Sequence, residues 1–220
     1  MLNKLKHKLN IYSSEYNLKL EDTSFLVSLS GGIDSIIMAS LMLKIRDEHI
    51  CRIGFAHINH NAHYKSADVE RFCSTYAKTN NVIFYRHDIF INPKCNFESI
   101  AREKRYNILD NISKKHSYHF ILTAHHQDDQ LETLFMKKID NGDWISKIGI
   151  RESLGKIRRP LLENSKNDIK LYAKKNNISW IEDPTNVDMS FRRNKIRNFS
   201  LPNALKLNPL LKESLLNTSF

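Results

Sequence analysis

The sequence has 220 residues, of which 41% are hydrophobic and 26% charged, a composition typical of a globular protein with one main domain. Its longest apolar run, Ile36–Leu43, is too short to cross a membrane, and the N-terminus lacks a signal-peptide pattern, so we expect a cytoplasmic protein with no membrane partner. The net charge of +10 favours a polyanionic partner. The three cysteines include no CxxC pair, which argues against a disulfide framework.

Along the chain, apolar strand-like runs alternate with amphipathic helical patterns. This alternation predicts an α/β fold: a doubly wound, mainly parallel five-stranded sheet flanked by helices (Rossmann-like), with a small basic helical extension at the C-terminus. Ligands of such sheets bind at the carboxyl ends of the strands, where the strand order switches. The predicted strands are Ser24–Leu29, Ile53–Ile58, Val82–Tyr85 and Phe120–Thr123, and the predicted helices are Ile36–Arg46, Asp68–Lys78, Glu98–Lys115 and Asp129–Lys138.

A glycine-containing loop follows the first predicted strand and opens a helix. Its glycines let the backbone fold closely around phosphate oxygens, and the amides at the helix start favour an anion. Asp34 can hold a magnesium ion against the phosphates, whereas the lysine of a Walker A loop is absent. We therefore predict a site for ATP and magnesium formed by Ser30, Gly31, Gly32, Ile33, Asp34 and Ser35.

The motif His57-Ile58-Asn59-His60 ends the second predicted strand and so lies at the same edge of the sheet. We interpret His57 as a contact to the nucleotide and His60 as a contact to the acceptor substrate. Ordinary polar loop residues are the alternative. No cysteine pair accompanies these histidines, which disfavours zinc.

Two histidines and three carboxylates crowd the start of the helix after the fourth strand. Asp129 and Glu132 are three residues apart and share a helical face. Such crowding is costly unless a cation or a cationic substrate lies there, although a solvated acidic helix start would also suit the helix dipole. The candidate residues are His125, Asp128, Asp129 and Glu132.

Basic residues concentrate in the C-terminal third, where 14 Lys and Arg stand against seven Asp and Glu from position 151 onward. Arginines suit phosphates because they bind them bidentately. Solvated lysines on helix surfaces would give the same excess. Ser165 and Asp168 predict a capping box that opens a helix to about Lys175. The candidate phosphate or RNA contacts are Arg102, Arg105, Arg192, Arg193 and Arg197.

Taken together, these motifs resemble the tRNA(Ile)-lysidine synthetase family of the N-type ATP pyrophosphatases, the PP-loop superfamily. The matching segments, in order, are SGGIDS, HINH, ESIAREKRY, TAHHQDDQLET, RPLL, WIEDPTN and RRNKIRN, between about Phe25 and Pro202.

The resemblance implies a carbon–nitrogen ligase. Such an enzyme adenylates the wobble cytidine of tRNA(Ile) with a CAU anticodon, and the ε-amine of free L-lysine then displaces AMP to give lysidine. It also implies catalytic roles for Asp34, Arg102, His125, Asp129 and Glu132, with Arg102 stabilising charge near the activated base and the acidic cluster gripping the lysine ammonium.

The sequence departs from the family in two respects. Of the usual glycine-rich, arginine-led segment after the DDQxET helix only Gly142 is kept, and we expect no C-terminal tRNA-clamping domain. The predicted catalytic domain covers residues 1–200, less regular from about 143, and residues 201–220 form a helical tail or linker. A monomer and a homodimer are both compatible with the sequence.

Two other functions compete with this one. One is another ATP pyrophosphatase that modifies tRNA, such as a thiolase, for which Cys51, Cys73 and Cys95 lack the usual pairing. The other is a non-catalytic RNA-binding remnant, which would have little reason to keep both the phosphate loop and the carboxylate cluster.

Overall fold

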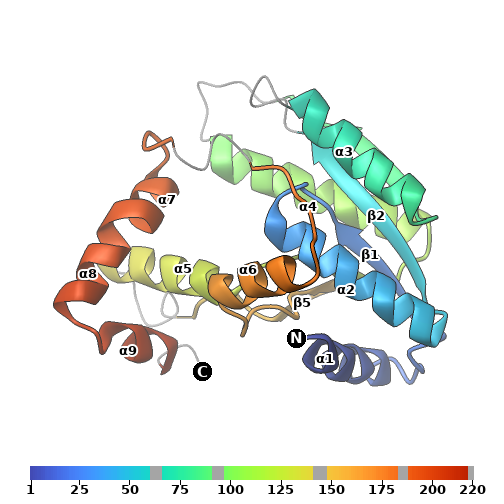
Figure 1. The fold of residues 1–220 in the computed structure, drawn as a ribbon, viewed down its shortest axis with the longest axis horizontal. Helices are drawn as coiled ribbons and strands as arrows, with labels where there is room; N and C mark the ends of the chain where they lie inside the picture. Colours follow the sequence, from blue (N-terminus) through green and yellow to red (C-terminus); the bar gives the residue numbers. More distant parts are fainter. Residues whose placement is uncertain (60–65, 91–96, 141–147, 183–187, 218–220) are drawn as a thin grey trace.

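The computed structural model describes residues 1–59, 66–90, 97–140, 148–182 and 188–217. At its centre is a sheet with the strand order β3-β2-β1-β4-β6-β5 (Figure 1). All neighbouring strands are parallel except the pair β5–β6. The strands are β1 (Ser24–Ser28), β2 (Arg52–Asn59), β3 (Ile83–Asp88), β4 (Phe120–Leu122), β5 (Ser153–Leu154) and β6 (Ile157–Arg158).

The doubly wound, mainly parallel α/β sheet is confirmed, but the described residues form six strands where five were predicted. The additional pairing is a short antiparallel edge, in which Leu154 is opposite Ile157. Its turn contains Gly155 with φ +55°, a conformation that glycine adopts without strain. Strands of two residues are too short to leave an alternating pattern in the sequence.

Four of the helices follow the predicted patterns closely, and the capping box at Ser165 is confirmed: its Oγ accepts from the Asp168 amide at 3.1 Å while its own amide donates to Asp168 at 2.9 Å. None of the described helices is both long and apolar enough to cross a bilayer. The helices are α1 (Leu2–Ser14), α2 (Ile33–His49), α3 (Ser66–Thr79), α4 (Phe97–Lys115), α5 (Gln127–Ile139), α6 (Lys166–Lys175), α7 (Arg192–Lys195), α8 (Leu201–Leu207) and α9 (Leu211–Asn217).

Helices cover both faces of the sheet (Figure 1). On one face, residues of α1, α2, α3 and α6 share a single core with β1 and β2. On the other face, α4 contributes Leu109 and Ile112 to a second core with Leu26 and Ile121. The helix α1 was not predicted. Its Leu5, a member of the first core, is followed at positions 9 and 12 by Leu and Tyr that are also buried, the spacing of an amphipathic helix.

The C-terminal helices pack on α5 rather than on the sheet (Figure 1). Leu131 and Leu134 of α5 form a small separate core with Ile196, Leu201 and Leu215. A π-helical turn, Ile196–Ser200, joins α7 to α8 without an intervening loop. Residue 200, the predicted end of the catalytic domain, therefore lies inside the continuous helical segment formed by α7, the π-helical turn and α8.

The strand order reverses beside β1. The chain passes from β1 to β2 through α2 on one face and returns from β3 to β4 through α4 on the other, so that β4 lies on the opposite side of β1. The carboxyl ends of β1 and β4 thus border the crevice in which ligands of such sheets bind. The glycine loop and the His125–Glu132 cluster follow these two strands, so the fold brings both motifs to this crevice.

Gly54 in β2 provides a test of the packing between the sheet and Tyr118. A methyl group at position 54 would come within 2.7 Å of Tyr118 Cζ and 3.2 Å of Tyr85 Cε2. Because a buried overpacked site forces side chains off their rotamers, Gly54→Ala should lower the free energy of unfolding by about 1–3 kcal/mol, measured by urea denaturation. In a Tyr118→Phe background, which removes the hydroxyl oxygen nearest to the added methyl group, Gly54→Ala should lower the free energy of unfolding by less. An equal loss of unfolding free energy in both backgrounds would contradict this packing.

Candidate functional site

The loop between β1 and α2 has the close backbone packing expected of a phosphate cradle. Gly31 has φ +83°, and a Cβ there would lie 2.7 Å from Val69 Cγ1, so no other residue fits without strain. The Ser30 amide and hydroxyl both donate to Ser35 Oγ at 3.0 Å, and Ser35 Oγ in turn donates to the Gly32 carbonyl at 2.9 Å. These bonds fix the turn that presents the start of α2 to the crevice.

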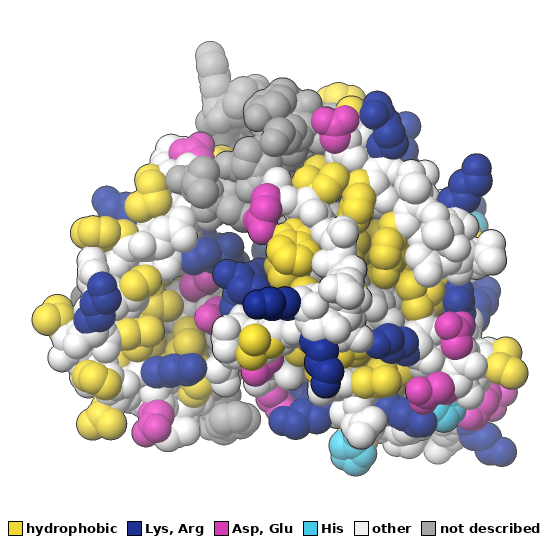
Figure 2. All heavy atoms as spheres, viewed as in Figure 1, with side chains coloured by type: hydrophobic (Ala, Val, Ile, Leu, Met, Phe, Trp, Pro, Cys, Tyr) yellow, Lys and Arg dark blue, Asp and Glu magenta, His cyan; other side chains and the backbone are white. Residues whose placement is uncertain are grey.

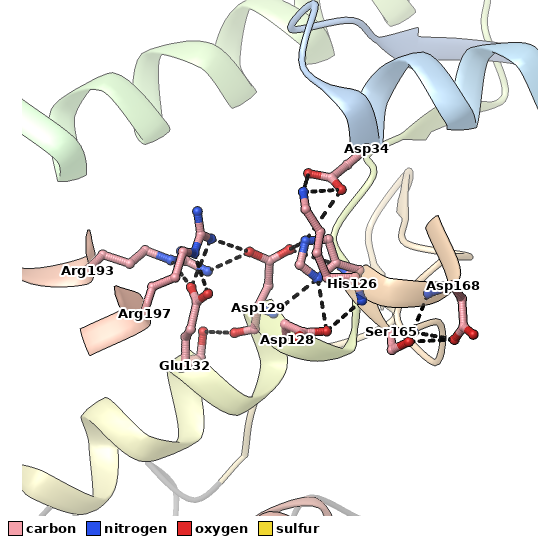
Figure 3. Close-up of polar contacts among 11 residues, drawn as sticks. Asp34, His126, Asp128, Asp129, Glu132, Ser165, Asp168, Arg193 and Arg197 are labelled. Carbon is pink, nitrogen blue, oxygen red and sulfur yellow. Dashed lines mark hydrogen bonds and ion pairs between the residues drawn. The ribbon is translucent and has the colours of Figure 1, made fainter. Parts of the chain in front are cut away.

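Asp34, in the first turn of α2, is held in its charged form. Lys166 Nζ from α6 lies 2.6 Å and 2.8 Å from its two carboxylate oxygens, and His126 Nε2 lies 3.6 Å from Oδ1 (Figure 3). Burial alone would raise the pKa of Asp34, but His126 and Lys166 outweigh it and hold the pKa below its ordinary value. The carboxylate is thus ionised and already placed against a cation.

His126 connects Asp34 to Asp129. It is the N-cap of α5, where Nδ1 of the neutral imidazole accepts from the Asp129 amide at 3.4 Å while the His126 amide donates to Asp129 Oδ2 at 3.0 Å. Burial lowers the pKa of the imidazole, but the hydrogen bond and charge of Asp34 together with the charge of Asp129 raise it above 6.5 overall. Histidine is an unusual N-cap, and sequence reasoning did not assign this role to it.

His125, its neighbour, has the opposite electrostatic environment. Burial, followed by the positive charges of Arg159, Arg102 and Arg105, lowers its pKa to about 3 in spite of the carboxylate of Asp129. Its Nδ1 lies 3.0 Å from Thr123 Oγ1. His125 is therefore neutral at physiological pH and a weak proton acceptor in this state.

Asp129 and Glu132 point from α5 toward the C-terminal helices (Figure 3). Glu132 is 2% exposed, and its oxygens accept from Arg193 Nε at 2.8 Å and from Arg197 Nη2 at 3.0 Å. Asp129 accepts from the same two arginines at 3.1 Å and 3.2 Å. Arg193 and Arg197 thus share one helical face, and this face contacts the carboxylates of α5.

The other predicted site residues have different surroundings. Asp128 accepts from the Lys166 amide at 2.7 Å, which joins the starts of α5 and α6. His57 is buried, donates from Nδ1 to the Leu29 carbonyl at 2.8 Å and so fixes the end of β1 beside β2. Arg192 pairs with Asp140 at the far end of α5. His60 lies outside the described residues.

Three arginines surround Tyr106 in the middle of α4. Arg102 and Arg105 lie over its ring, 5.1 Å and 5.7 Å from the centroid, and Arg159 Nη2 donates to its hydroxyl at 3.4 Å. Arg159 is 2% exposed, and its Nε has no hydrogen-bond partner among the described residues. Burial, together with the charges of Arg102 and Arg193, lowers the pKa of Arg105. A cluster of guanidinium groups without a carboxylate in the described residues favours an anion.

The site offers one carboxylate, Asp34, for a magnesium ion that arrives with nucleotide. Magnesium in proteins is usually held by one or two carboxylates together with phosphates of the substrate and waters. No group of three or more His, Cys, Asp or Glu side chains in the described residues is arranged to hold a metal on its own. The donor set therefore fits a metal shared with phosphates.

Comparison with known proteins identifies relatives of this chain. A family model described as a PP-loop domain matches residues 1–204. The tRNA(Ile)-lysidine synthase of Persephonella marina is 34% identical over 94% of this chain and 47% of that protein, that of Coxiella burnetii 33% over 82% and 41%, and that of Buchnera aphidicola 35% over 83% and 42%. The chain spans about half the length of the curated relatives it matches.

Solved structures share the fold. The U34-tRNA thiolase NcsA from Methanococcus maripaludis, solved with its [4Fe-4S] cluster, superposes with a TM-score of 0.76 and 17% identity, covering 99% of this chain and 77% of that one. A glutamine-dependent NAD+ synthetase from Acinetobacter baumannii, in complex with ADP, gives a TM-score of 0.53 at 16% identity over 80% of this chain and 32% of that one. At these identities the likeness concerns the fold alone.

The two neighbouring histidines should titrate in opposite directions. NMR of histidine-labelled protein, with signals assigned through His125→Gln and His126→Gln, should show His126 titrating above pH 6.5 and His125 neutral down to about pH 3. The stabilisation from charged His126 is present below pH 6.5 and is lost as pH rises through its folded-state pKa, whereas His125 lowers stability as pH falls below 6.5. Titration of His125 between pH 5.5 and 7.5 would contradict this electrostatic picture.

Proposed function

The chain belongs to the PP-loop domain family, and from that premise we propose that it is an ATP-dependent tRNA(Ile)-lysidine synthetase, which converts the wobble cytidine of a CAU anticodon to lysidine. One observation carries the proposal: the phosphate loop and the carboxylate pair meet at the sheet edge through the contacts Asp34–His126–Asp129. A nucleotide held on the loop is thereby adjacent to carboxylates suited to a cationic nucleophile. The choice of substrates in this proposal rests on the curated relatives, which are tRNA(Ile)-lysidine synthases.

In the first proposed step, oxygen O2 of the cytidine attacks the α-phosphorus of ATP, and pyrophosphate leaves. The backbone around Gly31 and the start of α2 hold the phosphates, since no side chain obstructs their approach there. Magnesium held by Asp34 supplies charge neutralisation for the phosphates when it is bound. Arg102, in the arginine cluster beside the crevice, stabilises negative charge at the reacting centre.

In the second proposed step, the neutral ε-amine of lysine attacks carbon C2 of the adenylated base, and AMP leaves with the former O2. Free lysine arrives as an ammonium, so it must lose a proton before attack, and a group of the His125–Glu132 cluster accepts that proton. Asp129 and Glu132 bind this ammonium. Burial raises the pKa of Asp129, but His126 and Arg193 outweigh it and keep Asp129 ionised, which suits it to hold a cation.

Cation binding at Asp129 and Glu132 involves an exchange. In the described structure the guanidinium groups of Arg193 and Arg197 occupy the positions around these carboxylates. A lysine ammonium enters by taking the place of a guanidinium, which is then released toward an anion such as the tRNA backbone. The molecule is hollowed between α7 and α6, and acidic and basic side chains gather at this hollow (Figure 2).

The thiolase alternative is disfavoured by the cysteines. Cys51 and Cys73 are both buried, and burial raises their pKa values to about 11 and about 12, so neither is a ready nucleophile. Cys73 packs instead against the glycine loop, 3.3 Å from the position that a Cβ of Gly31 would take. Cys95 lies outside the described residues.

Incorporation of labelled lysine tests the proposed function. The chain, incubated with ATP, magnesium, labelled lysine and tRNA(Ile) with a CAU anticodon, should transfer label to the tRNA, and Asp34→Asn should reduce transfer by at least a hundredfold while tRNA binding persists. ATP cleavage without transfer of lysine would favour another tRNA-modifying ATP pyrophosphatase. No ATP turnover at all would favour a non-catalytic RNA-binding protein.

The arginine cluster should contribute to tRNA binding through phosphates. Arg102→Ala and Arg105→Ala should each weaken tRNA binding and reduce the slope of log K against log salt by roughly 0.7–0.9, the value for one lost phosphate contact. Lys114→Ala, which removes a charge paired with Asp110 at the other end of α4, is the matched control and should leave the slope unchanged. Equal effects of all three variants would assign the cluster a general electrostatic role only.

A further inference from the structure

The glycine loop contains no lysine, yet a lysine lies beside it in the folded chain. P-loops of the Walker type place a lysine on the β- and γ-phosphates, and the segment Ser30–Ser35 has no equivalent. Lys166, which is 132 positions away from Asp34 in the sequence, brings its ammonium to 2.6 Å from that carboxylate. The fold therefore supplies a cation where the loop lacks one.

Lys166 is fixed in position by its backbone and not by its side chain. It is the first residue of α6, whose N-cap Ser165 forms a capping box with Asp168. Its amide donates to Asp128 at 2.7 Å, and buried Ile169 anchors the helix against α2. The helix is thus held without the contact between Lys166 Nζ and Asp34, and the long side chain is free to change partners.

The segment after α6 also returns to the loop. The Ile181 amide donates to the Gly31 carbonyl at 3.1 Å, so the chain touches the glycine loop both at the start of α6 and beyond its end. Lys166 and Asp34 are each about one-third exposed at their side chains. An ion pair of this exposure contributes little to stability, so stability alone does not account for a lysine placed beside the glycine loop.

We propose that Lys166 is an ATP-binding residue whose ammonium moves from Asp34 to the β- and γ-phosphate oxygens when ATP binds. Asp34 is thereby released for the metal that accompanies the nucleotide, and the positive charge of Lys166 remains within the site. This exchange avoids the repulsion between the Asp34 carboxylate and the incoming phosphates. The proposal rests on the ATP-binding part of the proposed function, and it does not depend on lysine or tRNA as substrates.

The test compares ATP with AMP, which lacks the β- and γ-phosphates. Dissociation constants for both nucleotides, measured with magnesium by calorimetry, should show that Lys166→Ala weakens ATP binding roughly tenfold to a hundredfold and leaves AMP binding within about twofold. Lys166→Arg, which keeps a cation, should retain most of the ATP affinity. Lys170→Ala, one turn further along α6 and exposed, is the matched control and should bind both nucleotides like the parent chain.

Three results would overturn the assignment of Lys166. Equal losses for ATP and AMP would mean that Lys166 supports the structure of the site or contacts the α-phosphate. Unchanged ATP binding in Lys166→Ala, or a parent chain that does not bind ATP, would exclude a phosphate contact. The ratio of ATP to AMP affinity within one variant is insensitive to a misfolded fraction. A parent chain that binds ATP through Lys166 but forms no lysidine would refute the proposed function alone.

Discussion

The carboxylates at the carboxyl edge of the sheet have to be neutralised, and much of the architecture follows from this constraint. Glu132 is 2% exposed and the side chain of Asp129 is 13% exposed, so each would be costly without a partner, and Asp34 nearby is paired as well. The partners come from distant segments: Lys166 from α6, and Arg193 from α7. The elements that follow the sheet in sequence thus bring positive charge to its edge in addition to their apolar packing.

The same constraint explains how one site can serve two kinds of ligand. Where the proposed function places a metal ion, at Asp34, the folded chain places an ammonium group, and where it places a lysine ammonium, at Asp129 and Glu132, it places guanidinium groups. Under the proposed function, the internal cations and the substrate cations therefore compete for the same carboxylates. When a substrate cation binds, an arginine or lysine is released beside the crevice, and anionic phosphates are the groups that such a side chain would bind.

Local features were predictable because a few neighbouring residues determine them. The capping box of Ser165 and Asp168 and the glycine loop after β1 are examples, since each depends on spacing within six residues. The positions of Lys166 and Arg159 could not be predicted, because their contacts join segments more than 50 positions apart and leave no periodic signal. The helix α1 was missed for a different reason: its apolar residues have helical spacing, but lysines lie between them and the segment was considered only as a signal peptide.

The helical segment from Arg192 to Ser200 contributes both ionic and apolar contacts to the site. Arg193 and Arg197 are four residues apart, and the π-helical turn that contains Arg197 keeps it on the side that faces Glu132. Ile196 between them packs on Leu131 and Leu134, so apolar and ionic contacts come from the same short segment. Removal of this segment would leave the buried carboxylate of Glu132 without a counter-charge, so the free energy of unfolding would fall by more than the loss of the apolar contacts alone would cause. Glu132 therefore depends on a segment some 60 positions away for its counter-charge, and under the proposed function a substrate that replaces those arginines must supply an equivalent positive charge.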